Sequence, residues 1–186
     1  SLSEANPVQK VSIIARGMAA GYTISLPMED QTLMPRKKLI AEMIGLLGGR
    51  AAEELVFDDI TSGASNDIER VTQLARTMVT RLGMSAELGP MVYGQKEELI
   101  CLGREISEQR DYSESVAEKI DKEVRTLVND AYNQAKSILT KYRKELDEIA
   151  IRLLEVETLS REEFEKIFPP PVPHHSGTPE LNHIPQ

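Results

Sequence analysis

The stretch that decides the fold is GGRAAEEL at residues 48–55, which is followed by TSGASNDIER at residues 61–70. Arg50 to Leu55 are strong helix formers, so one helix is expected to continue through the two preceding glycines with at most a bend. In the second stretch, Asn66 and Glu69 have the spacing of a capping box, with Asn66 as the N-cap. Together they predict two helices joined by a polar loop.

Apolar residues recur at helical spacing on both sides of this loop. Pro35 suits the first turn of the earlier helix, and Gly83 suits the end of the later one. Each helix is therefore expected to bury one face. The two stripes are Leu39, Ile40, Met43, Ile44 and Leu47 in the earlier helix, and Ile68, Val71, Ala75, Met78, Val79 and Leu82 in the later one.

The C-terminal third is also predicted to be helical. A further capping box begins at Ser115, and the apolar pattern after it predicts a long helix that reaches about Lys141. Leu146 to Leu154 carry the pattern of another helix. Thr158-Leu159-Ser160 is expected to start a third, with Ser160 and Glu163 as its capping box. These elements predict a C-terminal helical bundle.

Two short segments near the N-terminus have the composition of strands. Val8 to Ala15 places Val11 and Ile13 on one face, and Tyr22 to Leu26 repeats an apolar, β-branched pattern. The Gly17 to Gly21 connection between them favours a β-hairpin.

The predicted fold class is therefore mainly α, with a small β-hairpin or sheet near the N-terminus. Residues 1–168 are expected to form one domain, made of a strand region (1–30), motif-bearing helices (31–83) and the C-terminal helical bundle (113–168). The tail, 169–186, is rich in proline and is predicted to be disordered.

Composition excludes several classes of protein. The net charge of −8, from 30 acidic and 22 basic residues, argues against a nucleic-acid or anionic-membrane binder. Cys101 is the only cysteine, so no intrachain disulfide can form. No apolar stretch is long enough to cross a bilayer, and Ser1 to Gln9 lack the pattern of a signal peptide. We expect a soluble piece of a longer protein.

Histidines are confined to the proline-rich tail, at His174, His175 and His183. The folded part therefore holds no histidine triad and no helix-borne histidine pair. The three tail histidines could bind a transition metal ion loosely, although a solvated tail is the simpler interpretation.

The two opening stretches resemble the signature stretches that follow the H-E-x-x-H helix in FtsH-type peptidases, which are ATP-dependent zinc metalloproteases. The resemblance covers roughly Pro7 to Phe168, and its helical C-terminal part matches in pattern more than in letters. Shorter matches in the same order are VSIIARG (11–17), AGYT (20–23), GMS (83–85) and LGP (88–90).

The resemblance implies a zinc metallopeptidase domain of the FtsH type. In the complete protein it implies zinc at the peptidase site, and ATP with Mg in a separate ATPase module. It also implies a homo- or hetero-hexamer that degrades unfolded or membrane polypeptides. A membrane anchor elsewhere in the protein would leave this domain on the cytoplasmic side, or on the matrix or stroma side of an organelle.

By the same resemblance, Asp67 matches the aspartate that serves as third zinc ligand. A carboxylate in the first turn of a helix is held in a fixed geometry, and the alternative is that it simply favours the helix dipole. Glu53 matches a glutamate that could hydrogen-bond a ligand histidine, with a surface carboxylate as the alternative. Glu54, Asp58 and Asp59 are interpreted as solvated charges.

The first predicted strand offers a substrate site, because an unpaired strand edge can bind an extended polypeptide through main-chain hydrogen bonds. The alternative is an ordinary half-buried strand. The residues assigned to this site are Val11, Ser12, Ile13, Ile14 and Ala15.

The chain also departs from the family pattern. Ser1 to Asn6 contain no H-E-x-x-H, so two histidine ligands and the general-base glutamate are missing, and no catalytic residue is assigned. The chain alone is therefore expected to be inactive. Two alternatives remain open: a non-catalytic ring subunit or chaperone partner, and a helical assembly module built on the helix predicted from Ser115 to Lys141.

Overall fold

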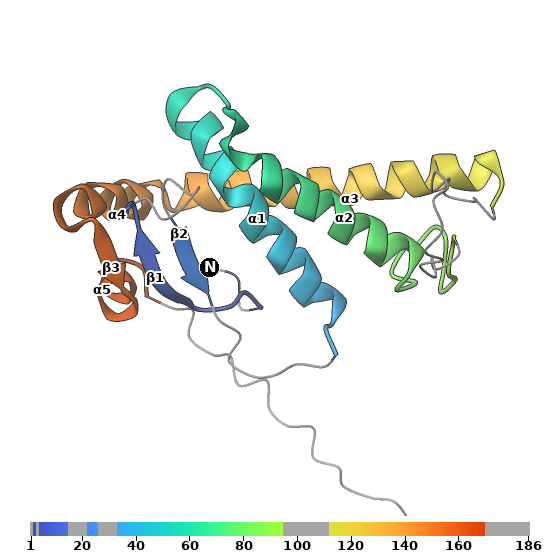
Figure 1. Ribbon diagram of the computed structural model, residues 1–186, viewed down its shortest axis with the longest axis horizontal. Coiled ribbons are helices and arrows are strands. Elements are labelled where there is room, and N and C mark those ends of the chain that lie inside the picture. The colour runs from blue at the N-terminus through green and yellow to red at the C-terminus, as the bar shows by residue number, and fades with distance from the viewer. Residues whose placement is uncertain (1, 3, 15–21, 26–32, 95–111, 170–186) are drawn as a thin grey trace, which may run out of the picture. The chain divides into compact units, whose positions relative to one another are not determined.

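The computed structural model describes residues 2, 4–14, 22–25, 33–94 and 112–169, which contain the helices and strands of the fold (Figure 1). They belong to two compact units. One unit combines the two ends of the sequence, residues 1–28 and 148–186, and the other is the continuous stretch 29–147.

The continuous unit is built from three helices that pack against one another: α1 (Arg36–Phe57), α2 (Ser65–Thr80) and α3 (Glu114–Lys141). The predicted continuation of the first helix through its glycines is confirmed. Met43, Met78 and Ile120, one from each helix, are almost completely buried. The core therefore forms where the apolar stripes of the three helices meet.

Two helix starts differ from the prediction. A short 3₁₀ turn, η1 (Ser62–Ala64), precedes α2, so the N-cap is Ala64 and Asn66 lies inside the helix. Thr61 caps this turn instead, because its hydroxyl accepts a hydrogen bond from the Gly63 amide. Likewise α3 begins after Ser113, whose side chain accepts from the Val116 amide, and not at Ser115.

The second unit contains a three-stranded antiparallel sheet in the order β2-β1-β3. The strands are β1 (Val8–Ser12), β2 (Tyr22–Ser25) and β3 (Thr158–Ser160). The predicted hairpin is confirmed as β1 and β2. β3 was expected to be the start of a helix, but only its last residue, Ser160, caps one.

That helix is α5 (Arg161–Ile167), which packs against β1 and β3. The predicted capping box of Ser160 and Glu163 is confirmed in both directions. α4 (Arg143–Val156) precedes β3, and the boundary between the two units falls within it.

The expected free edge on the first strand is wrong. Val11 pairs with Thr23 on one side and with Leu159 on the other, which makes β1 the central strand. Beyond the strand, the Ile13 amide donates to the Glu157 carbonyl at 3.0 Å, and the Ile14 amide donates to the Ser12 hydroxyl at 3.2 Å. Ala15 lies outside the described residues.

The helices expected to form one C-terminal bundle are divided between the units. α3 packs with α1 and α2, whereas α5 packs on the sheet. The division arises because β3 pairs with β1 and so places the end of the sequence beside its beginning. The predicted disorder of the proline-rich tail concerns residues outside the described part, apart from Pro169.

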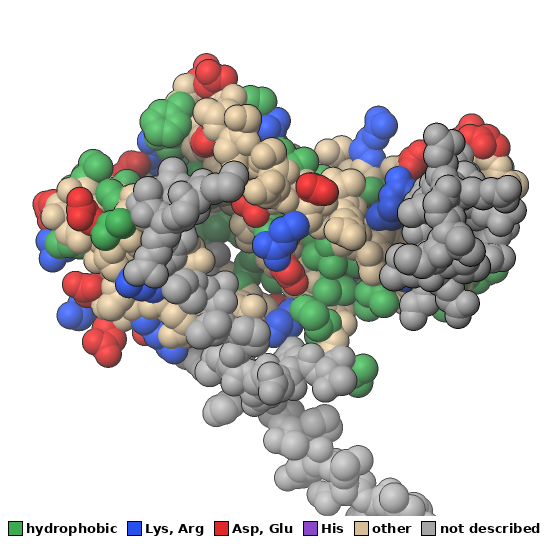
Figure 2. All heavy atoms as spheres, in the orientation of Figure 1, with side chains coloured by type: hydrophobic (Ala, Val, Ile, Leu, Met, Phe, Trp, Pro, Cys, Tyr) green, Lys and Arg blue, Asp and Glu red, His purple; other side chains and the backbone are tan. Residues whose placement is uncertain are grey.

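Within the described residues, no helix is both long and apolar enough to cross a membrane. On the face drawn in Figure 2, basic side chains are scattered among acidic ones.

Candidate metal-ligand site

Asp67 lies in the first turn of α2, directly after the 3₁₀ turn. Its side chain is half-buried. Among the described residues, its carboxylate takes part in no hydrogen bond or ion pair. The N-terminal turn of a helix favours a negative charge, because backbone amides there point toward the helix start. Asp67 is therefore an anionic oxygen donor held on a rigid element, without a protein partner in the described part of the chain.

The segment before Asp67 is held by Glu53, near the end of α1. One carboxylate oxygen of Glu53 accepts the Thr61 hydroxyl at 2.8 Å, and the other accepts the Thr61 amide at 3.1 Å. Hydrogen bonds from the Thr61 amide, and then from its hydroxyl, lower the pKa of the Glu53 carboxyl. Both oxygens of Glu53 are thus engaged by one residue of the loop.

Thr61 passes this restraint on to the turn itself. Its hydroxyl oxygen accepts the Gly63 amide at 3.2 Å while donating to Glu53. η1 contacts both α1 and α2, and its last residue, Ala64, is buried. The Glu53–Thr61–Gly63 chain of hydrogen bonds, which we call the Thr61 clamp, therefore fixes the backbone that leads into the first turn of α2.

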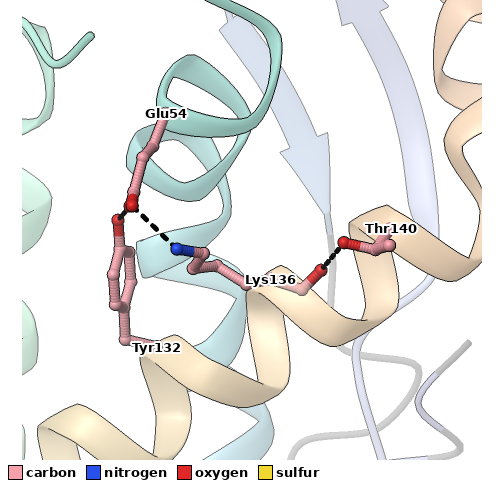
Figure 3. Close-up of polar contacts among 4 residues, drawn as sticks. All are labelled: Glu54, Tyr132, Lys136 and Thr140. Carbon is pink, nitrogen blue, oxygen red and sulfur yellow. Dashed lines mark hydrogen bonds and ion pairs between the residues drawn. The ribbon is translucent and has the colours of Figure 1, made fainter. Parts of the chain in front are cut away.

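Glu54 is not the solvated charge that the sequence suggested. Its carboxylate accepts hydrogen bonds from the Tyr132 hydroxyl and from Lys136 Nζ, the latter at 2.7 Å, and so joins α1 to α3 (Figure 3). The Lys136 and Tyr132 hydrogen bonds lower the pKa of Glu54. The pKa of Lys136 is raised by the same carboxylate, and the pKa of Tyr132 is raised by burial and then by its bond to Glu54.

No group of three or more His, Cys, Asp or Glu side chains in the described residues is arranged to hold a metal ion. The tail histidines His174, His175 and His183 lie outside the described part. Among the described residues, the Asp67 carboxylate is the candidate ligand, and its oxygen chemistry suits one corner of a zinc site.

The sequence interpretation missed the role of Thr61 and the partners of Glu54. A threonine two residues before a glycine is a signal for a side-chain-capped turn, and it could have indicated the Thr61–Gly63 bond of the clamp, but not the bonds to Glu53. Tyr132 and Lys136 are four residues apart and thus share one face of α3, but nothing in the sequence pairs that face with Glu54.

Comparison with known proteins gives the family. The model for peptidase family M41 matches residues 1–167. Over 168 residues, 90% of the chain, the sequence is 53% identical to an ATP-dependent zinc metalloprotease FtsH of Pseudothermotoga lettingae. It is 54% identical to the Thermotoga maritima protein of that name over 163 residues, 87% of the chain.

A third relative, the FtsH 1 protein of Sphaerobacter thermophilus, is 51% identical over 180 residues, 96% of the chain. The matched region makes up only 27–28% of the length of these three relatives. The chain belongs to peptidase family M41, as an FtsH-like zinc metalloprotease domain.

Proposed function

We propose that this chain is part of an ATP-dependent zinc metalloendopeptidase that degrades unfolded or membrane proteins, and that Asp67 is one of its zinc ligands. The observation that carries the proposal is the half-buried Asp67 carboxylate, which has no partner in the described residues and sits on a helix start braced by the Thr61 clamp. Membership of peptidase family M41 supplies the reaction class.

In this proposal the chain supplies a negatively charged zinc ligand and the helix that holds it in position. The Asp67 oxygen would bind the cation and offset its charge, and the first turn of α2 would keep that oxygen in place. Zinc, when bound, would polarise the scissile carbonyl and activate a water molecule. Residues 1–186 contain no H-E-x-x-H, so we propose that the two histidine ligands and the general base come from outside this sequence.

The wider assembly is proposed from the relatives. The names of the relatives describe ATP-dependent enzymes, which supports ATP and Mg in a separate ATPase module of the same protein. Family resemblance supports a hexamer acting on polypeptide substrates, anchored in a membrane with this domain on the cytoplasmic or organelle-interior side. Main-chain pairing of substrate along β1 is left out of the proposal, because both edges of that strand are occupied.

The test is Asp67→Asn in the full-length protein. Asparagine has nearly the same shape, so α2 should form, but a neutral amide is a much weaker zinc ligand. We expect zinc content and casein degradation to be lost while ATP hydrolysis is largely retained. Glu53→Gln should be milder, with an effect of about 10–100-fold, because Glu53 acts through other residues. The 186-residue chain alone should not cleave casein with added zinc.

Two outcomes would overturn this proposal. If Asp67→Asn retains wild-type zinc and activity, Asp67 is not a ligand. If the full-length wild-type protein binds no zinc, the chain belongs instead to a non-catalytic ring subunit.

A further inference from the structure

The Thr61 clamp is placed where it can control the direction of Asp67. It joins α1 to the turn that begins α2, and Asp67 is only six positions beyond Thr61. Nothing else of this kind restrains the turn: in the described residues, Asn66 and Ser65 provide no side-chain cap for α2. A clamp on the preceding residues thus replaces the usual capping interaction.

We infer that Thr61 is a positioning residue for Asp67, and that Glu53 acts through Thr61. The inference rests on the proposed function, because it concerns the binding of zinc by Asp67. It differs from the role that family resemblance suggests for Glu53, a hydrogen bond to a ligand histidine, in that each Glu53 oxygen accepts a hydrogen bond from Thr61.

The spacing inside the turn supports this inference. A Cβ atom added at Gly63 would lie 3.2 Å from the Thr61 hydroxyl oxygen and 3.8 Å from Glu53 Oε1. The turn is therefore packed closely against the clamp, and a change at the Thr61 hydroxyl should be felt by the backbone of η1. Since η1 continues directly into α2, a displacement of the turn should also displace Asp67, the proposed zinc ligand.

The experiment replaces Thr61 in the full-length protein. Thr61→Val keeps the size of the side chain but removes its donor and acceptor, whereas Thr61→Ser keeps the hydroxyl. We expect Thr61→Val to weaken zinc binding by about 10–100-fold in competition with a chelator, the range for partners that orient a ligand. Thr61→Ser should stay close to wild type. Thr140→Val is the matched control, because it removes a threonine hydroxyl bonded to the Lys136 carbonyl at 2.8 Å in α3.

A second readout does not depend on zinc. Hydrogen exchange of the peptide covering residues 58–68 should become faster in the zinc-free Thr61→Val protein and remain unchanged in the Thr140→Val control. If zinc binding weakens without faster exchange in this peptide, the hydroxyl acts by some route other than positioning and the inference is wrong.

A double-mutant cycle distinguishes the two roles of Glu53. If Glu53 acts through Thr61, the effects of Glu53→Gln and Thr61→Val on zinc affinity should be strongly non-additive. Additive effects would support a separate contact with a ligand histidine and overturn the inference. If the Thr61→Val protein does not accumulate, the same two measurements are made on Glu53→Gln. Hydrogen exchange of the 58–68 peptide should become faster and zinc affinity should fall.

Failure of the inference can be told from failure of the proposed function. If Asp67→Asn abolishes zinc binding while Thr61→Val has wild-type affinity, Asp67 is a ligand and the clamp does not position it. If neither substitution changes zinc binding, the ligand assignment itself is wrong.

Discussion

Two adjacent carboxylates at the end of α1 serve different parts of the continuous unit. Glu53 holds the loop before α2, and Glu54 binds Tyr132 and Lys136 of α3. Successive residues on a helix point about 100° apart, so neighbours can reach different elements. The pair therefore ties one end of α1 to α3 and to the loop before α2 through polar contacts, in addition to the apolar core.

The Glu54 contact makes stability depend on pH. Because the pKa of Glu54 is lowered in the folded state, its contribution is complete above the ordinary carboxyl pKa of 4.5 and is lost as pH falls through the folded value. The pKa of Lys136 and that of Tyr132 are raised, so their contributions are complete below 10.5 and 10.0 and are lost at more alkaline pH.

We predict that Glu54→Gln lowers the urea midpoint of the 186-residue chain at neutral pH, and that the difference from wild type shrinks as pH falls below about 4.5. Urea unfolding followed by circular dichroism across the acid range measures this. Asp130→Asn is the control, because Asp130 is an exposed carboxylate of α3 with no hydrogen bond or ion pair among the described residues. If the difference in urea midpoint between Glu54→Gln and wild type stays the same as the pH falls, Glu54 does not make the stabilising contact assigned to it.

At the scale of elements, two glycines of the continuous unit have opposite environments. Gly49 lies inside α1, and a Cβ atom added there meets nothing within 4 Å. Gly83 follows α2 with a φ of +60°, and its added Cβ would lie 2.9 Å from Pro90 Cα. One position tolerates a side chain and the other excludes it.

We predict that Gly49→Ala stabilises the chain by about 0.5–1 kcal/mol, because alanine loses less backbone entropy in a helix. Gly83→Ala should destabilise it by about 1–2 kcal/mol or more, since a left-handed conformation and a backbone contact both oppose the new methyl group. Urea unfolding of both variants measures whether each substitution raises or lowers the free energy of unfolding. A stabilising Gly83→Ala would contradict the turn geometry.

The sequence predicted the long helices correctly but not β3 or the start of α2. Long helices were predicted because their stripes repeat over several turns, as from Leu39 to Leu47 in α1. β3 was missed because three residues carry no period, and its sequence, Thr158-Leu159-Ser160, also suits a helix start. The N-cap of α2 was misplaced because η1 moves the helix start one residue ahead of Asn66. Thr61, which caps η1, is bonded to Glu53 of another helix, a contact that local spacing does not reveal.

The candidate site was predictable only in part. Asp67 came from a motif match, and its role as a zinc ligand stays a prediction. The Thr61 clamp depends on the distance between the end of α1 and the loop, which no spacing in the sequence fixes. The supposed strand edge was wrong because the partner of Val11 on its second side is Leu159, almost the whole chain away.

At the scale of the whole molecule, the unusual feature is a unit assembled from both ends of the sequence. The buried Ser12 hydroxyl lies 2.8 Å from the Thr158 hydroxyl and also donates to the Glu157 carbonyl at 3.3 Å. Leu159, in β3 opposite Val11, is completely buried. The N-terminal strand should therefore depend on residues near the C-terminus for its stability.

We predict that Leu159→Ala destabilises this unit by about 2–5 kcal/mol, the usual cost of truncating a buried leucine. Amides of β1 should lose protection from hydrogen exchange together with those of β3, although some 150 residues separate them in the sequence. Amides in the cores of α1, α2 and α3 should keep theirs, because those helices form the other unit.

Leu154→Ala is the control for this substitution, since the same truncation is made in α4 at a side chain that is 77% exposed. It should change stability by no more than about 0.5 kcal/mol. Exchange measured by mass spectrometry on the 186-residue chain distinguishes the possible couplings. If Leu159→Ala leaves β1 protected, the two ends are not one cooperative unit. A cavity in one independent unit cannot lower the local stability of the other unit. If α1, α2 and α3 lose protection equally with β1, the two units therefore unfold together.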